Sequence, residues 1–264
     1  MIDLSYVPAS EFARLRALDV DPARKTAVFA DLCRLNALYM ITRAGSGHIG
    51  TSFSCLDLVS WLYLNELTAD DVFFSSKGHD APALYAVLTA LGRLPFDKIN
   101  ELRRLNGLPG HPDVSTPSIE TNTGSLGMGV SKAKGMLLAK RLLGDGVQRG
   151  RAFVLTGDGE LQEGQFWESL VSAANARQDN LTVIVDHNKI QSDGWRARRA
   201  ESRGRRPRVR PAPVRRTAAD RRVRPPADAL RRRPAPRAGA HPGRRGSLGP
   251  CAFAIVATVA SCEF

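Results

Sequence analysis

Two short apolar runs, each followed by a polar turn, constrain the fold of this chain more than any other feature. Residues 152–155 read Ala-Phe-Val-Leu and lead into Gly157-Asp158-Gly159, while residues 181–185 read Leu-Thr-Val-Ile-Val and lead to Asn188. A segment of helix length separates the runs, which is typical of parallel strands joined by a crossover helix. The carboxyl ends of such strands lie at one edge of the sheet, where open α/β folds bind their ligands.

The residue types at this edge suit a cation and a phosphate. Gly157 and Gly159 allow a tight turn and a close approach of backbone to a ligand. Asp158 offers a carboxylate oxygen and Asn188 an amide oxygen, and Mg²⁺ prefers such oxygens together with ligand phosphates. A helix expected to start near Leu161 would direct its N-terminal dipole at the same place. A plain strand-turn-helix, with Asp158 as a turn residue, is the alternative, and it leaves Asn188 unexplained.

The rest of residues 1–195 alternates between helical and strand patterns. Helices are expected at 21–39, 54–64, 80–91 and 130–143, and strands at 72–75, 152–156 and 181–186. In the first of these helices the apolar positions are Val28, Phe29, Leu32, Leu35 and Leu38. Helices between short apolar strands predict an α/β fold, a parallel sheet with helices on both faces.

Five motifs, in order along residues 46–191, resemble transketolase, in the form whose amino-terminal section is a separate chain. Gly157-Asp158-Gly159-Glu160 followed by Asn188 is similar to the thiamine diphosphate signature, and residues 186–191 extend the likeness. The upstream motifs are Ser46-Gly47-His48-Ile49-Gly50, Ser76-Lys77-Gly78-His79, Gly110-His111-Pro112 and Gly124-Ser125-Leu126-Gly127-Met128-Gly129. The resemblance implies a thiamine diphosphate-binding fold with thiamine diphosphate and Mg²⁺ as cofactors.

The resemblance also implies roles for individual residues. The implied metal ligands are Asp158, the side chain of Asn188 and the backbone carbonyl of Ile190. The implied cofactor-binding residues are His79, Gly124, Leu126, Gly157, Gly159 and Asn188. His48 and His111 would line the substrate channel and act in proton transfer or carbonyl polarisation. Glu163 matches a subunit-contact glutamate of the family, whereas we interpret His187 as a packing residue.

The activity implied by the resemblance is transfer of a two-carbon ketol unit between sugar phosphates, a reaction of the pentose phosphate pathway in the cytoplasm. The family's pyrimidine-binding domain is not recognisable in this chain. We therefore expect the partner to be a carboxyl-terminal transketolase subunit, in a hetero-oligomer or dimer of dimers, and no activity from the chain alone. Another thiamine diphosphate enzyme, of the dehydrogenase E1 type, and a truncated non-catalytic remnant are the alternatives.

Residues 196–264 differ from the rest of the chain in composition. The net charge of the whole is +12, but this segment holds 19 Arg and 4 acidic residues, so it carries +15 and residues 1–195 carry −3. We expect two regions: 1–195, an incomplete diphosphate- and Mg²⁺-binding domain, and 196–264, a divergent Arg/Pro-rich tail. Residues 252–259 within this tail read as a strand again.

Residues 196–246 contain 8 Pro and no aromatic residue, a composition that predicts disorder. Out-of-frame translation of GC-rich DNA explains it best, and a selected linker or a nucleic-acid-binding arm are the alternatives. The slightly acidic body predicts neither a membrane nor a specific nucleic-acid partner. Four cysteines without metal-binding spacing suggest free thiols in a reducing cytosol.

Overall fold

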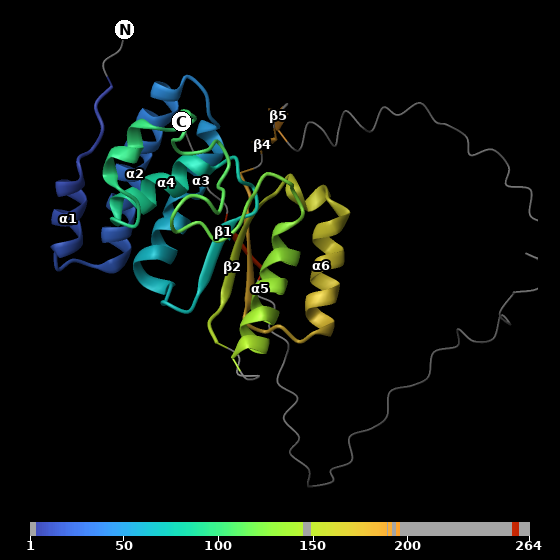
Figure 1. The fold of residues 1–264 in the computed structure, drawn as a ribbon. Coiled ribbons are helices and arrows are strands. Elements are labelled where there is room, and N and C mark those ends of the chain that lie inside the picture. Colours follow the sequence, from blue (N-terminus) through green and yellow to red (C-terminus); the bar gives the residue numbers. More distant parts are fainter. Residues whose placement is uncertain (1–3, 145–148, 189, 192–193, 196–254, 259–264) are drawn as a thin grey trace, which may run out of the picture. The chain divides into compact units, whose positions relative to one another are not determined.

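The computed structural model describes residues 4–144, 149–188, 190–191, 194–195 and 255–258 (Figure 1). The chain divides into two compact units, Met1–Asp193 with Cys251–Phe264, and Gly194–Pro250. The second unit contributes one described element, the short strand β5 (Gly194–Trp195), and all others belong to the first. The predictions made for 196–246 lie outside the described residues.

A four-stranded parallel sheet forms the centre of the first unit. The strands β1 (Val72–Ser75), β2 (Ala152–Gly157), β3 (Leu181–Asp186) and β6 (Ile255–Thr258) lie in the order β1-β2-β3-β6. The parallel sheet predicted from the two apolar runs is thus confirmed. The strand predicted within 252–259 is also present, and it pairs with β3 from Val183↔Ile255 to Asp186↔Thr258.

Helices cover both faces of this sheet (Figure 1). Phe73, Phe153 and Ile184 pack with α1 (Ala9–Ala17), α2 (Pro22–Ala44), α3 (Ile49–Trp61) and α4 (Ala81–Ala90) in one apolar core. Their strand neighbours Phe74 and Val154 pack with α5 (Gly129–Leu143) and α6 (Gly164–Asn175) in a second core. Successive strand side chains point to opposite faces, so strands of continuously apolar sequence require cover on both sides.

The predicted helices are present, with shifted ends and one altered face. Asp21 accepts a hydrogen bond from the backbone N–H of Arg24 at 2.9 Å and so caps α2, which runs on to Ala44. Its buried face contains Phe29 and Cys33, whereas two positions of the predicted apolar face, Val28 and Leu35, are exposed. The α3 helix begins five residues earlier than predicted and continues into a π-helical turn, Leu62–Glu66.

The helix expected near Leu161 begins later than predicted. A short 3-10 turn, Glu160–Gln162, follows β2, and α6 starts only at Gly164. The reason is that the carboxylate of Glu160 turns inward and accepts hydrogen bonds from other elements. Two shorter elements complete the first unit, the 3-10 turn Phe96–Asn100 and the strand β4 (Ile190–Gln191).

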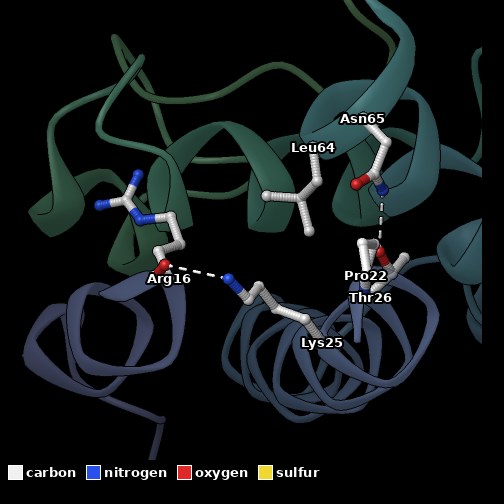
Figure 2. A pocket seen from close by; sticks show the side chains of 6 residues that line it. All are labelled: Arg16, Pro22, Lys25, Thr26, Leu64 and Asn65. Carbon is white, nitrogen blue, oxygen red and sulfur yellow. Dashed lines mark hydrogen bonds between the residues drawn. The ribbon is translucent and has the colours of Figure 1, made fainter. Parts of the chain in front are cut away.

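A cavity of about 280 Å³ lies where the end of α1 and the start of α2 meet the π-helical turn Leu62–Glu66 (Figure 2). Its lining residues are Arg16, Pro22, Lys25, Thr26, Leu64 and Asn65. Lys25 Nζ donates to the backbone carbonyl of Arg16 at 3.3 Å, and Asn65 Nδ2 donates to Thr26 Oγ1 at 3.0 Å. None of the residues predicted for the functional site lines this cavity. None of the described helices is long and apolar enough to cross a membrane.

Candidate functional site

The carboxyl ends of β2 and β3 bring the predicted metal ligands onto neighbouring strands. Gly157, the last residue of β2, is in register with Asp186, the last residue of β3. Asp158 follows directly, is 3% exposed, and donates its backbone N–H to the carbonyl of Asp186 at 3.2 Å. Asn188 lies two residues beyond β3 and is half-buried. A carboxylate and an amide from distant parts of the sequence therefore meet at one edge of the sheet.

A buried lysine ties the ends of β1 and β3 together. Lys77 is 2% exposed, and its Nζ lies 2.7 Å from Oδ2 of Asp186 and 3.3 Å from Oδ2 of Asp80. The same ammonium donates to Thr51 Oγ1, on α3, at 3.1 Å. These contacts join three elements around one charge. Lys77 lies two residues after the end of β1, and its partner Asp186 lies two residues before Asn188.

Hydroxyl groups also donate to the two buried carboxylates that face Lys77. Ser54 Oγ donates to Asp186 Oδ2 at 2.6 Å, and Ser75 Oγ donates to Asp80 Oδ2 at 2.7 Å. Burial alone lowers the pKa of Lys77, but the negative groups that face it, including Asp80 and Asp186, outweigh burial and raise the pKa above its ordinary value. The lysine is consequently a permanent cation beneath the site.

A further buried acid, Glu160, fixes the glycine-rich loop at residues 124–129. Its Oε1 accepts from the backbone N–H of Gly127 at 2.7 Å and from the hydroxyl of Ser76, and its Oε2 accepts from Gly157 N at 3.4 Å. Ser76 Oγ in turn accepts from the N–H of Gly129 at 3.1 Å. Burial raises the pKa of Glu160, and these hydrogen bonds oppose the rise. One carboxylate thus joins this loop to the ends of β1 and β2.

Gly78 allows three loops to meet at the end of β1. Its φ is +69°, in the left-handed region that favours glycine. A Cβ at this position would lie 2.6 Å from Thr123 Oγ1, and 2.9 Å from both Gly124 N and His111 Cδ2. Any side chain here would therefore push the glycine-rich loop and the His111 loop away from the strand end.

Three histidines from three different loops gather beside this glycine. His48 occupies the N-cap position of α3, and its ring centroid lies 5.1 Å from that of His79. His79 follows β1 and its Nδ1 lies 2.9 Å from the carbonyl of Lys77. The ring of His111 lies close to both Gly78 and Gly124. The sequence predicted all three as site residues, and the fold brings them together.

The surroundings of two of these histidines favour the neutral imidazole. Burial lowers the pKa of His79. Burial also lowers the pKa of His111, and the positive charge of Arg103 lowers it further. Both side chains are therefore uncharged at neutral pH and able to accept a proton.

The other predicted residues lie along the same edge. Gly124 has φ +116°, Leu126 is 39% exposed, Gly159 opens the 3-10 turn after β2, and Ile190 lies in β4. His187, which we interpreted as a packing residue, has its Nε2 3.9 Å from Asp158 Oδ2. Among the described residues there is no group of three or more His, Cys, Asp or Glu side chains arranged to hold a metal ion.

Sequence reasoning assigned no role to Lys77 or Glu160. Each stands inside a motif that was singled out, Ser76-Lys77-Gly78-His79 and Gly157-Asp158-Gly159-Glu160. The available signal was a charged residue placed at the end of an apolar strand, where burial is expected and a charge needs a partner. The identity of those partners depends on contacts between distant segments.

Residues 25–205 match the protein-family model described as transketolase, thiamine diphosphate binding domain. The chain belongs to this family. The resemblance noted in the five sequence motifs is thereby confirmed, and so is the fold class. The transketolase of Leishmania mexicana is a structural neighbour with a TM-score of 0.61 and 28% identity, over 67% of this chain and 29% of that one.

Curated relatives include proteins named as transketolase subunits. One of the subunits of the apulose-4-phosphate transketolase of Actinobacillus succinogenes is 38% identical over 160 residues, which is 56% of this chain and 57% of that protein. The 6-deoxy-6-sulfo-D-fructose transketolase subunit SqwG of a Clostridium species is 37% identical over 177 residues, 63% of each protein. This member of the transketolase family matches about three fifths of the length of these relatives.

Proposed function

We propose that this chain is the amino-terminal, thiamine diphosphate-binding subunit of a split transketolase, transferring a two-carbon ketol unit between sugar phosphates. The observation that carries the proposal is the convergence of Asp158, Asn188 and three histidines at the carboxyl edge of one parallel sheet. Open α/β sheets bind ligands at this edge. The family assignment supports the same cofactor.

The residues at the edge have the chemistry that a metal-bound diphosphate requires. One buried carboxylate, Asp158, one amide, Asn188, and the backbone carbonyl of Ile190 would hold Mg²⁺ through oxygen, leaving positions for phosphate oxygens. The backbone at Gly157 and Gly159 would lie against the diphosphate, and His79 would face it. Gly124 and Leu126 would contact the ring system of the cofactor.

The cofactor, when bound, supplies the carbanion that breaks and forms the carbon–carbon bond. The part of this chain is to orient the substrate and to move protons. His48 and His111 would contact the substrate carbonyl and hydroxyl groups, because their loops meet at the same strand end. A neutral His111 can take a proton from a sugar hydroxyl and return it later.

A partner subunit is part of the proposal. Its support is that two relatives are named as subunits of transketolases. We propose that a carboxyl-terminal subunit supplies the pyrimidine-binding domain, in a hetero-oligomer or dimer of dimers, and that the isolated chain is inactive. Work in the pentose phosphate pathway and a cytoplasmic location belong to the same proposal.

Two alternative functions are weaker. A dehydrogenase E1-type enzyme shares the cofactor, but the paired motifs Ser46-Gly47-His48 and Gly110-His111-Pro112 favour transketolase. A non-catalytic remnant would not require intact site motifs, whereas Asp158, Asn188 and the three histidines are all present in their motifs.

A coupled assay for ketol transfer tests the proposal. The isolated chain should be inactive, and addition of a carboxyl-terminal transketolase subunit with thiamine diphosphate and Mg²⁺ should produce activity. Because we interpret residues 196–246 as an out-of-frame product, the activity of the mixture should be low and should rise strongly when the reading frame is repaired. Ketol transfer by the unmixed chain would refute the partner requirement, and an inactive frame-repaired mixture would refute the assignment as a transketolase.

A further inference from the structure

The cavity beside the π-helical turn Leu62–Glu66 gathers two positive charges. Its lining includes Arg16, near the end of α1, and Lys25, in the first turn of α2, and it includes no acidic residue. Neither cation forms an ion pair with a carboxylate within the part of the chain that the structure describes. Their charges are therefore available to a ligand.

The length of α2 separates this cavity from the candidate functional site. Lys25 lies near the start of the helix, whereas His48 follows shortly after its end. A helix of 23 residues is roughly 30 Å long, so the two places lie near opposite ends of α2. The order along the chain agrees, because Leu62–Glu66 precedes β1 whereas His79 follows it. A ligand in the cavity is thus distinct from the cofactor and the substrate of the proposed function.

Backbone carbonyls hold both cations in place without neutralising them. Lys25 Nζ donates to the carbonyl of Arg16 at 3.3 Å, and Arg16 Nη1 donates to the carbonyl of Leu91 at 3.3 Å. Both carbonyls lie at the C-terminal ends of helices, where a cation is favourable. A lysine has three N–H donors and an arginine has five, so each residue keeps further donors for a ligand.

The rest of the lining combines neutral polar and apolar groups (Figure 2). Asn65 Nδ2 donates to Thr26 Oγ1 at 3.0 Å and to the carbonyl of Trp61 at 3.3 Å, so the amide oxygen is the part that can serve a ligand. Leu64 and Lys25 face one another across the cavity, and Pro22 adds a second apolar surface. A few polar groups on apolar walls are typical of small-molecule sites, and 280 Å³ suits a small ligand.

We propose that this cavity binds a small hydroxylated phosphate monoester. Such a group carries close to two negative charges at neutral pH, which matches two cations better than a single carboxylate does. The guanidinium of Arg16 can bond two phosphate oxygens, and the ammonium of Lys25 can bond a third. A hydroxyl of the ligand would donate to Asn65 Oδ1, and its carbon chain would lie against Leu64.

Glycerol 3-phosphate is the probe, titrated into the full chain and followed by NMR of Leu and Thr methyl groups. We expect saturable shifts of the methyl resonances of Leu64 and Thr26, which line the cavity. Lys25→Gln should raise the dissociation constant at least about tenfold, the loss of one charge-assisted hydrogen bond. Lys25→Arg keeps the charge and should bind within about threefold of the parent. Absence of saturable shifts in the parent overturns the proposal.

Arg24→Gln is the matched control for Lys25→Gln. Arg24 precedes Lys25 in the same turn of α2, is exposed and does not line the cavity. Its substitution removes the same charge, so the dissociation constant should not change. The Arg-rich segment 196–246 is identical in all of these proteins, and its attraction for anions cancels in the comparison. Equal dissociation constants for Arg24→Gln and Lys25→Gln would show only a diffuse attraction and would contradict the proposal.

Leu64→Trp tests the cavity without altering any charge. The side chain of Leu64 points into the cavity, so the larger ring occupies the space that the ligand would fill (Figure 2). The shift of the Thr26 methyl resonance should then be lost, while the methyl spectrum of the remaining leucines shows that the variant is folded. A folded Leu64→Trp that binds glycerol 3-phosphate like the parent overturns the proposal.

Three further compounds define the class of ligand. Inorganic phosphate and glycerol should each bind more weakly than glycerol 3-phosphate, because each lacks one of the two parts that the cavity recognises. Glycerate, with a single negative charge, should also bind more weakly. Binding of inorganic phosphate, glycerol or glycerate as tight as that of glycerol 3-phosphate contradicts the assignment to a hydroxylated phosphate monoester.

Discussion

Two polar regions share one edge of the sheet and differ in how their charges are handled. Beneath the strand ends, Lys77 is almost fully buried and contacts the carboxylates of Asp80 and Asp186 within 3.3 Å, so these three buried charges all face an opposite one. The mouth of the site is formed by His48, His79 and Arg103, whose side chains are more accessible to solvent than Lys77. Arg103 has no carboxylate partner among the described residues. The comparison separates charge that holds the strand ends from charge that is available to a ligand.

The physical cost of disturbing the two regions differs accordingly. A buried charge that loses its partner retains its desolvation penalty and has no compensation. A partly exposed group is solvated by water when its partner is removed, so the loss is small. Substitutions beneath the strand ends should therefore act on stability, while substitutions at the mouth should act on binding and on pH dependence.

The largest expected effect is that of Lys77→Met. The change leaves the carboxylates of Asp80 and Asp186 buried without a cation, which should lower the free energy of unfolding by about 3–5 kcal/mol. The exposed pair Arg14–Glu11 provides the control, and Arg14→Gln should cost less than about 1 kcal/mol. Urea denaturation measures both, and comparable losses would remove the distinction between the two regions.

A smaller loss is expected from Gly78→Ala. The added Cβ would meet Thr123 and Gly124 at positive φ, for a loss of about 2–4 kcal/mol from overpacking and left-handed strain together. Gly92 has nearly the same φ, +73°, with nothing within 4 Å of an added Cβ, so Gly92→Ala should cost only about 1 kcal/mol. Equal losses at the two glycines would show that the three loops do not meet at Gly78 as described.

The smallest effect concerns pH. The pKa of His79 is lowered in the native state, so the unfolded chain binds a proton at about pH 6.5 while the native chain does not. This contribution to stability is present above the unfolded pKa and is lost as the pH falls from that value toward the native pKa. The thermal stability measured from pH 7 to pH 5 should therefore fall less steeply in His79→Gln than in the parent.

Comparison of the two proteins at each pH removes the contribution of Glu160. Burial raises the pKa of that carboxyl, so its contribution changes with pH in the opposite direction. Identical slopes for the parent and His79→Gln would show that the histidine is as well solvated in the native state as in the unfolded chain.

The sequence predicted the strands and the convergence of Asp158 with Asn188, but not the contacts that support them. Strands 72–75 and 181–186 have the predicted bounds, because their apolar character and the flanking polar residues are local signals. The bond from Lys77 to Asp186 joins residues 109 positions apart, and that from Glu160 to Gly127 spans 33. Such pairs are set by packing between elements, and the start of α6 shifted for the same reason.

Calorimetric titration with thiamine diphosphate and Mg²⁺ tests the central claim, that this strand edge holds the diphosphate through a metal ion. The titration uses the frame-repaired chain mixed with a carboxyl-terminal subunit. It compares Asp158→Ala with Asp57→Ala, which removes an exposed carboxylate of α3 that pairs with Arg34. Asp158→Ala removes the one carboxylate assigned to the metal, so we predict that Mg²⁺-dependent binding is abolished while Asp57→Ala binds like the parent. Unchanged thiamine diphosphate affinity in Asp158→Ala would contradict the account.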